Sequence, residues 1–184
     1  MQPDAPRPAP QSKPAAAPKV QPAAARCVDS AIELAAGQSV AVRMYGRKKT
    51  GQTSPVVVHF HGGAFVSGDL DNGCTVGGLL EGAGAVVVSV AYPLTPFPQP
   101  VDTGYDVLKW VHRNRTKLGG QGALVYLAGE EAGGNLAAAV ALMARDQSHP
   151  PLAGQILLSP MLDPCVGTAS QRQVTGAAVD CKWV

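Results

Sequence analysis

The chain has 184 residues, a length that suits a single domain. Apolar residues make up 46% and charged residues 15%, a balance typical of an α/β domain with buried parallel strands. The formal charge of +2 is small, and no basic run interleaved with aromatic residues indicates nucleic-acid binding. No apolar stretch is long enough to span a membrane, and the N-terminus lacks the apolar core of a signal peptide, so we expect a cytoplasmic protein.

Residues 1–26 differ in composition from the rest of the chain. They hold seven prolines and eight alanines and show no hydrophobic periodicity. Such a segment cannot bury enough surface to offset the entropy lost on ordering. The sequence therefore predicts a disordered Pro/Ala-rich tail at 1–26 and a folded domain at 27–184.

The four cysteines are Cys27, Cys74, Cys165 and Cys181. None belongs to a Cys-x-x-Cys pair, which argues against a zinc ribbon or a thioredoxin-type redox site. We expect free thiols in a reducing cytoplasm, with a Cys165–Cys181 disulfide as the alternative.

Apolar periodicity divides the rest of the chain into strands and helices. The pattern predicts strands at 27–34, 39–45, 55–61, 85–91, 123–128 and 154–159, and helices within 72–81 and at about 100–117 and 133–145. Strands and helices alternate from residue 55 onward, which implies right-handed crossovers. The predicted fold class is α/β, with a mostly parallel sheet and helices on both faces, and ligands are expected beyond the carboxyl ends of its strands.

Two glycine-containing motifs follow predicted strands. In the first, His61-Gly-Gly-Ala-Phe65, the glycines allow a sharp turn whose free N–H groups can hold the oxyanion of an acyl-transfer intermediate, although an ordinary glycine turn is the alternative. The second, Gly129-Glu-Glu-Ala-Gly133, lies between a buried strand and a helix of small residues. This is the frame of a nucleophile elbow, Gly-x-Ser-x-Gly, but Glu131 stands where the serine belongs.

Together these motifs resemble those of the hormone-sensitive-lipase-like carboxylesterases of the α/β-hydrolase superfamily. That family carries His-Gly-Gly-Gly (or Ala) and, later, Gly-Asp-Ser-Ala-Gly-Gly-Asn-Leu-Ala. Here the second motif reads Gly129-Glu-Glu-Ala-Gly-Gly-Asn-Leu-Ala137, and only the two acidic positions differ. The resemblance extends over about 27–163. It implies that 27–184 is an incomplete α/β-hydrolase domain that lacks the C-terminal strands.

The resemblance also assigns roles to residues. It implies that Gly62, Gly63 and Ala132 form the oxyanion hole, that His61 positions the loop, and that Glu131 occupies the place of the nucleophile.

The family's catalytic acid and histidine come later in the sequence. No histidine follows His149, and neither Asp163 nor Asp180 lies in the family's Asp motif. We therefore expect the catalytic triad to lack its nucleophile, its histidine and its aspartate in this chain.

Three roles are open to Glu131. A carboxylate can attack directly, as the Asp at the same elbow does in haloalkane dehalogenases, but the resulting ester needs a base to cleave it. It can act as a general base if burial and the neighbouring Glu130 raise its pKa. We favour the third, an inactive elbow whose carboxylate partly fills the oxyanion hole.

His59 and His61 lie two residues apart on a predicted strand, so both rings are expected on one face. With Glu130 and Glu131 at a nearby strand end, metal binding is an alternative to simple packing. We favour packing and predict neither a metal nor a cofactor.

The favoured function is that of a family protein without ester hydrolase activity, either a remnant or a binder of a small ester or apolar ligand. Family members that became hormone receptors show that the pocket can outlive the triad. One alternative is an active carboxylic-ester hydrolase completed by a missing C-terminal part or a partner chain. Another is an assembly protein, since a partner or a second copy is expected to cover the open sheet edge.

Overall fold

The computed structural model of the chain describes residues 27–35, 37–163, 169 and 173. The strands are β1 (Cys27–Glu33), β2 (Ser39–Tyr45), β3 (Val56–Phe60), β4 (Val86–Val90), β5 (Val125–Glu130) and β6 (Gly154–Leu158). The helices are α1 (Cys74–Gly82), α2 (Gln99–Gly119) and α3 (Glu131–Asp146). The tail expected at 1–26 lies outside the described residues, as do Cys165, Asp180 and Cys181. Cys27 and Cys74 are free thiols.

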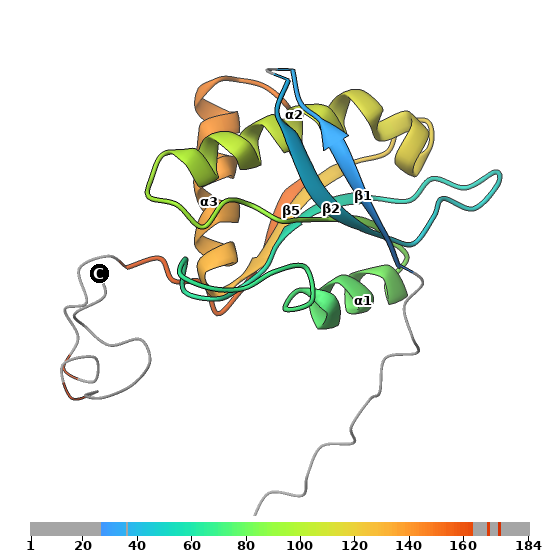
Figure 1. Cartoon of the computed structure of the whole chain (residues 1–184). Coiled ribbons are helices and arrows are strands. Elements are labelled where there is room, and N and C mark those ends of the chain that lie inside the picture. The colour runs from blue at the N-terminus through green and yellow to red at the C-terminus, as the bar shows by residue number, and fades with distance from the viewer. Residues whose placement is uncertain (1–26, 36, 164–168, 170–172, 174–184) are drawn as a thin grey trace, which may run out of the picture.

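The strands form one six-stranded sheet in the order β1-β2-β4-β3-β5-β6. β1, β2 and β4 pair antiparallel, whereas β4, β3, β5 and β6 run parallel. Figure 1 shows α2 and α3 on one face of the sheet and α1 on the other. The prediction of a mostly parallel sheet with helices on both faces is therefore confirmed.

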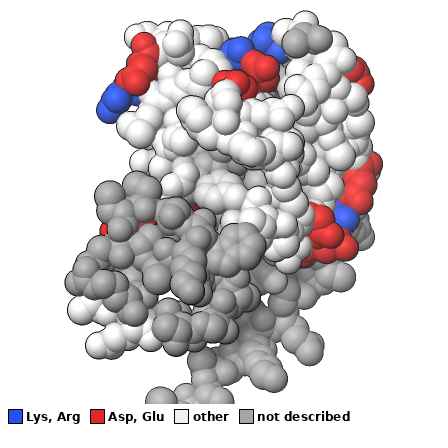
Figure 2. Space-filling view, turned by 60° about the vertical axis from the view of Figure 1, so that its left-hand side comes forward, with Lys and Arg blue, Asp and Glu red and all other residues white. Residues whose placement is uncertain are grey.

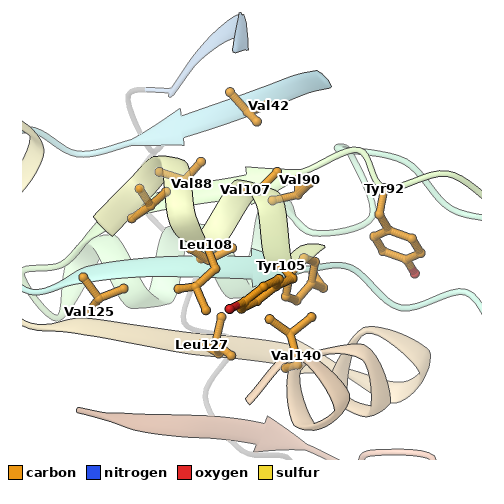
Figure 3. Close-up of a cluster of buried hydrophobic side chains, with 14 of the residues drawn as sticks. Val42, Val88, Val90, Tyr92, Tyr105, Val107, Leu108, Val125, Leu127 and Val140 are labelled. Carbon is orange, nitrogen blue, oxygen red and sulfur yellow. The ribbon is translucent and has the colours of Figure 1, made fainter. Parts of the chain in front are cut away.

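Most of the core lies between the sheet and the pair α2 and α3 (Figure 3). Every residue of β3 and β4 is buried, as expected for parallel strands covered on both faces. Tyr105, Leu108 and Val111 turn the apolar face of α2 onto the sheet, as their helical spacing predicts. A smaller cluster around Tyr45 and Val87 fills the space under α1.

The strand and helix of the elbow meet more tightly than the sequence predicts. The sequence predicts a strand at 123–128 and a helix at 133–145, joined by a tight turn that glycines flank. Instead β5 continues to Glu130 and α3 begins at Glu131. The whole turn is made at Glu131, whose φ of +51° reverses the chain in one step.

The edge strand β6 is apolar and only partly covered. Ile156 and Leu158 pair in register with Ala128 and Glu130 of β5, so they face the α1 side of the sheet. They are 38% and 40% exposed, because α1 packs on β2 and β4 and no other described helix covers β6 on that side. A partner covering this edge stays a prediction.

Charge is sparse on the surface that can be seen. On the face that Figure 2 shows, most described residues are uncharged, and the few Lys and Arg side chains lie beside Asp or Glu. Among the described residues, no helix is long and apolar enough to cross a membrane.

Two leucines, one in β5 and one just before it, test how much the core contributes to stability. Leu127 is fully buried, whereas Leu124, just before the strand, is 57% exposed. Leu127→Ala should lower the free energy of unfolding by about 2–5 kcal/mol through lost burial and a cavity. Leu124→Ala should change it by less than about 0.5 kcal/mol. Urea denaturation followed by circular dichroism measures both, and equal losses would contradict the placement of the core.

Candidate active site

The pairing of β3 with β5 brings the two glycine motifs together. Phe60, the last residue of β3, lies in register with Gly129 of β5. The loop that begins at His61 and the elbow that begins at Glu130 therefore leave the sheet side by side. They do so at the carboxyl ends of parallel strands, where ligands bind in such sheets.

The elbow depends on glycine because the two chains approach closely here. A Cβ atom on Gly133 would lie 2.1 Å from the carbonyl oxygen of Phe60, so no side chain fits. Glu131 itself has the left-handed φ that non-glycine residues adopt only when their surroundings enforce it. Such strain is a feature of nucleophile elbows.

The segment after β6 is tied to the elbow. The N–H of Met161 donates to the carbonyl oxygen of Glu131 at 3.0 Å. The Asn135 side chain in turn donates its Nδ2 hydrogen to the carbonyl oxygen of Met161 at 2.6 Å. The turn is therefore held from the loop after β3 and from the segment after β6.

The two carboxylates of the elbow accept hydrogen bonds from the facing loop. Glu130 Oε1 accepts from the N–H of Gly62 at 3.2 Å, and Glu131 Oε2 accepts from the N–H of Gly63 at 3.3 Å. Gly63 has a φ of +125°, which only glycine adopts without strain. These are the N–H groups that the sequence assigned to an oxyanion hole, and here side chains of the same chain occupy them. Ala132, the third expected donor, is fully buried in the first turn of α3.

His61 is buried at the base of the loop. Its Nδ1 donates to the carbonyl oxygen of Gly62 at 2.8 Å, and its ring stacks on Tyr92 with centroids 4.4 Å apart. The Tyr92 hydroxyl donates to the carbonyl oxygen of His61 at 2.8 Å. Burial lowers the pKa of His61 against the opposing effect of its bond to Gly62. Burial, and then the charges of Glu130 and Glu131, raise the pKa of Tyr92.

A hydrogen-bonded network that the motifs do not predict lies below the elbow. His59 Nε2 lies 2.7 Å from Glu130 Oε2, and His59 Nδ1 lies 2.9 Å from the hydroxyl oxygen of Ser89. His59 and Ser89 are direct neighbours in the β3–β4 register and are both fully buried. A single polar residue in each of two otherwise apolar buried strands was the signal that could have found them, since buried polar groups need partners.

The hydrogen bonds to Glu130 favour its ionised form, the carboxylate. Burial by itself would raise its pKa, but the hydrogen bonds from His59, Gly62 and its own backbone N–H outweigh burial. The pKa of Glu130 is therefore below its ordinary value of 4.5.

The other two histidines lie at the opposite end of the sheet. The rings of His112 and His149 meet edge to face, with centroids 5.3 Å apart. His112 lines a groove together with Val125 and Ala153, at the N-terminal ends of β5 and β6. Val125 and Glu130 are the first and last of the six residues of β5, and the five steps between them span about 17 Å along a strand.

Metal binding was the alternative to simple packing for His59 and His61, and ring nitrogens of both have other partners. The nitrogens of His59 bond to Ser89 and Glu130, and Nδ1 of His61 bonds to a carbonyl oxygen. Within the part of the chain that the structure describes, no group of three or more His, Cys, Asp or Glu side chains could hold a metal ion.

Comparison with known proteins agrees with this geometry. A family model described as alpha/beta hydrolase fold matches residues 57–182. The carboxylesterase NlhH of Mycobacterium tuberculosis is 40% identical over 125 residues, which are 66% of this chain and 39% of that protein. The gibberellin receptor GID1C of Arabidopsis thaliana is 35% identical over 150 residues, which are 77% of this chain and 43% of the receptor.

Solved structures give the same result. The esterase LipW from Mycobacterium marinum superimposes with a TM-score of 0.73 at 36% identity, over 86% of this chain and 51% of that one. The chain thus spans about half, or less, of the length of these relatives. Family match, sequence relatives and fold agree, and the chain belongs to the hormone-sensitive-lipase-like carboxylesterase family of the α/β-hydrolase superfamily.

Proposed function

We propose that this chain is a family member without ester hydrolase activity, whose elbow carboxylate fills the oxyanion hole from within. The observation that supports it most directly is the contact of 3.3 Å between Glu131 Oε2 and the N–H of Gly63. In an active esterase this donor faces the negative oxygen that develops in the transition state. Here it faces a negative side chain of the same protein.

The chemistry of Glu131 supports the same conclusion. A serine nucleophile gives its hydroxyl proton to a histidine as it attacks the ester carbonyl. A carboxylate has no such proton to give. Its charge, with that of Glu130 beside it, would also repel the oxyanion of a tetrahedral intermediate.

The described residues place no histidine as a hydrogen-bonded base for residue 131. The chain has four histidines, and the structure describes all of them. Next to the site, His59 bonds Ser89 and Glu130 through its two ring nitrogens, and His61 bonds the carbonyl oxygen of Gly62 through Nδ1. His112 and His149 lie at the other end of the sheet. None of the four histidines, all of which the structure describes, is hydrogen-bonded to the side chain of Glu131.

Small-molecule binding is the function that this site can retain. Relatives at similar identity include one named a carboxylesterase and one named a gibberellin receptor, so both an enzyme name and a receptor name occur among proteins like this one. The glycine loop and the elbow are both built in this chain. A ligand that displaced the Glu131 carboxylate would meet the N–H of Gly63, at an end of the sheet where such folds bind small molecules.

An active ester hydrolase is the second candidate, since the loop and the elbow match carboxylesterases at 40% identity. In that case a further segment or another chain supplies the acid and the base, and Glu131 attacks directly. The attack would leave an acyl group on Glu131 as an anhydride. Intact-mass analysis after incubation with p-nitrophenyl butyrate would reveal that adduct.

Ester turnover is the first test of the proposal. The full chain should release no p-nitrophenol from p-nitrophenyl acetate or butyrate above the rate of a Glu131→Gln variant. Glu131→Ser should also stay inactive, because it restores the hydroxyl but not the base. Turnover by the wild-type chain that Glu131→Gln abolishes would overturn the proposal and favour the second candidate.

Chemical rescue tests whether Glu131 fills the oxyanion hole. In Glu131→Ala the amide proton of Gly63 loses its charged acceptor, so its resonance in a ¹H–¹⁵N spectrum should move upfield. Added acetate should reverse this shift in Glu131→Ala and leave the wild type unchanged. Glu33→Ala, on an exposed position of β1, is the matched control and should respond to neither change. A Gly63 resonance that ignores the loss of Glu131 would refute the contact.

A further inference from the structure

A buried hydrogen-bonded network of Ser89, His59 and Glu130 has no part in the proposed function. It begins in β4, crosses to β3 and ends at the last residue of β5. His59 and Ser89 have no exposed surface, and the side chain of Glu130 is 18% exposed. The network therefore runs from the middle of the sheet to the candidate site.

The direction of the hydrogen bonds follows from their chemistry. An ionised carboxylate only accepts, so Nε2 of His59 carries a proton and donates it to Glu130. In the neutral imidazole, Nδ1 is then the acceptor for the hydroxyl of Ser89. A Cβ atom on Gly73 would lie 2.8 Å from Cε1 of His59, so the start of α1 packs directly against the ring and leaves it no room to turn.

Glu130 links the fixed His59 ring to the glycine loop that begins at His61. Its Oε2 is held by His59, and its Oε1 accepts from the N–H of Gly62. Glu131 bonds the next residue of the same loop, Gly63, but no described buried side chain holds its carboxylate. Of the two carboxylates, only Glu130 joins the rigid interior to the loop.

We propose that Glu130 is a positioning residue, oriented by His59 and Ser89, which fixes the glycine loop against the elbow whatever residue stands at 131. The inference does not depend on whether the site hydrolyses esters. The N–H of Gly62 then serves a structural bond within the protein. The N–H of Gly63 is the donor of the loop for which a ligand can compete with Glu131. The hydrogen bond between His59 and Glu130 thus orients the backbone donors of the loop, in addition to any stability that it contributes.

A tautomer change separates positioning from general stability. In Glu130→Gln the side chain keeps its shape, and its oxygen can still accept from Gly62. Its amide nitrogen now faces His59 as a donor, so Nε2 must become an acceptor and the proton must move to Nδ1, which then donates to Ser89. Long-range ¹H–¹⁵N spectra should therefore show the two ring nitrogens of His59 exchanging their protonated and unprotonated shifts.

The loop gives the second readout. In Glu130→Ala the amide resonance of Gly62 should move upfield, because its acceptor is removed. Glu33→Gln, on exposed β1, is the control and should leave both readouts unchanged. An unchanged His59 tautomer in Glu130→Gln would overturn the proposal. If Glu130→Ala does not fold, Glu130→Gln still decides the question because it is nearly isosteric.

The pH dependence of stability gives an independent check. The titratable groups around Glu130 are His59 and His61 at the end of β3, Tyr92 after β4 and Glu131 of α3. Because the pKa of Glu130 is lowered on folding, its contribution is complete above the ordinary value of 4.5 and is lost as the pH falls through the folded value. Wild type should exceed Glu130→Gln in urea stability at pH 7, and the gap should close below pH 4.5. A gap that is constant with pH would contradict the pairing, whereas esterase activity would leave this inference untouched.

Discussion

The site depends on the close approach of α3 to the end of β3. Only a glycine at 133 lets the first turn of the helix pass within contact of the Phe60 carbonyl oxygen. That contact fixes where the elbow lies relative to the glycine loop. It also explains why Glu131 adopts a left-handed conformation, since the strand before it and the helix after it are both held by packing. The geometry is therefore a property of the backbone, and it survives a change of the residue at the tip.

Electrostatics distinguishes this elbow from one that carries a serine. A serine leaves a neutral hydroxyl among backbone donors that wait for a negative charge. Here two adjacent glutamate side chains of the same protein accept from those donors. The cost of placing two negative charges side by side is offset by N–H donors from Gly62, Gly63 and His59. The arrangement is stable because each carboxylate has its own donors.

Much of this could be predicted from the sequence. Apolar runs and glycine positions were enough for the strands, the helices and the two motifs, because burial and backbone sterics act locally. The network of Ser89, His59 and Glu130 could not be predicted, because it depends on which strands are neighbours and in what register. The strand order β4-β3-β5 follows from long-range packing. The boundary at Glu131 was also missed, since a turn made at one strained residue has no glycine or proline at that residue to mark it.

The tie between Met161 and the elbow has a consequence for what can be attached to this fold. Because Asn135 and the Glu131 carbonyl oxygen hold Met161, the chain leaves β6 alongside the site. A group joined by a short linker just beyond this point would reach the site at an effective concentration in the millimolar range, without binding affinity of its own. The tie thus makes Met161 a suitable attachment point for holding an added chemical group near residue 131.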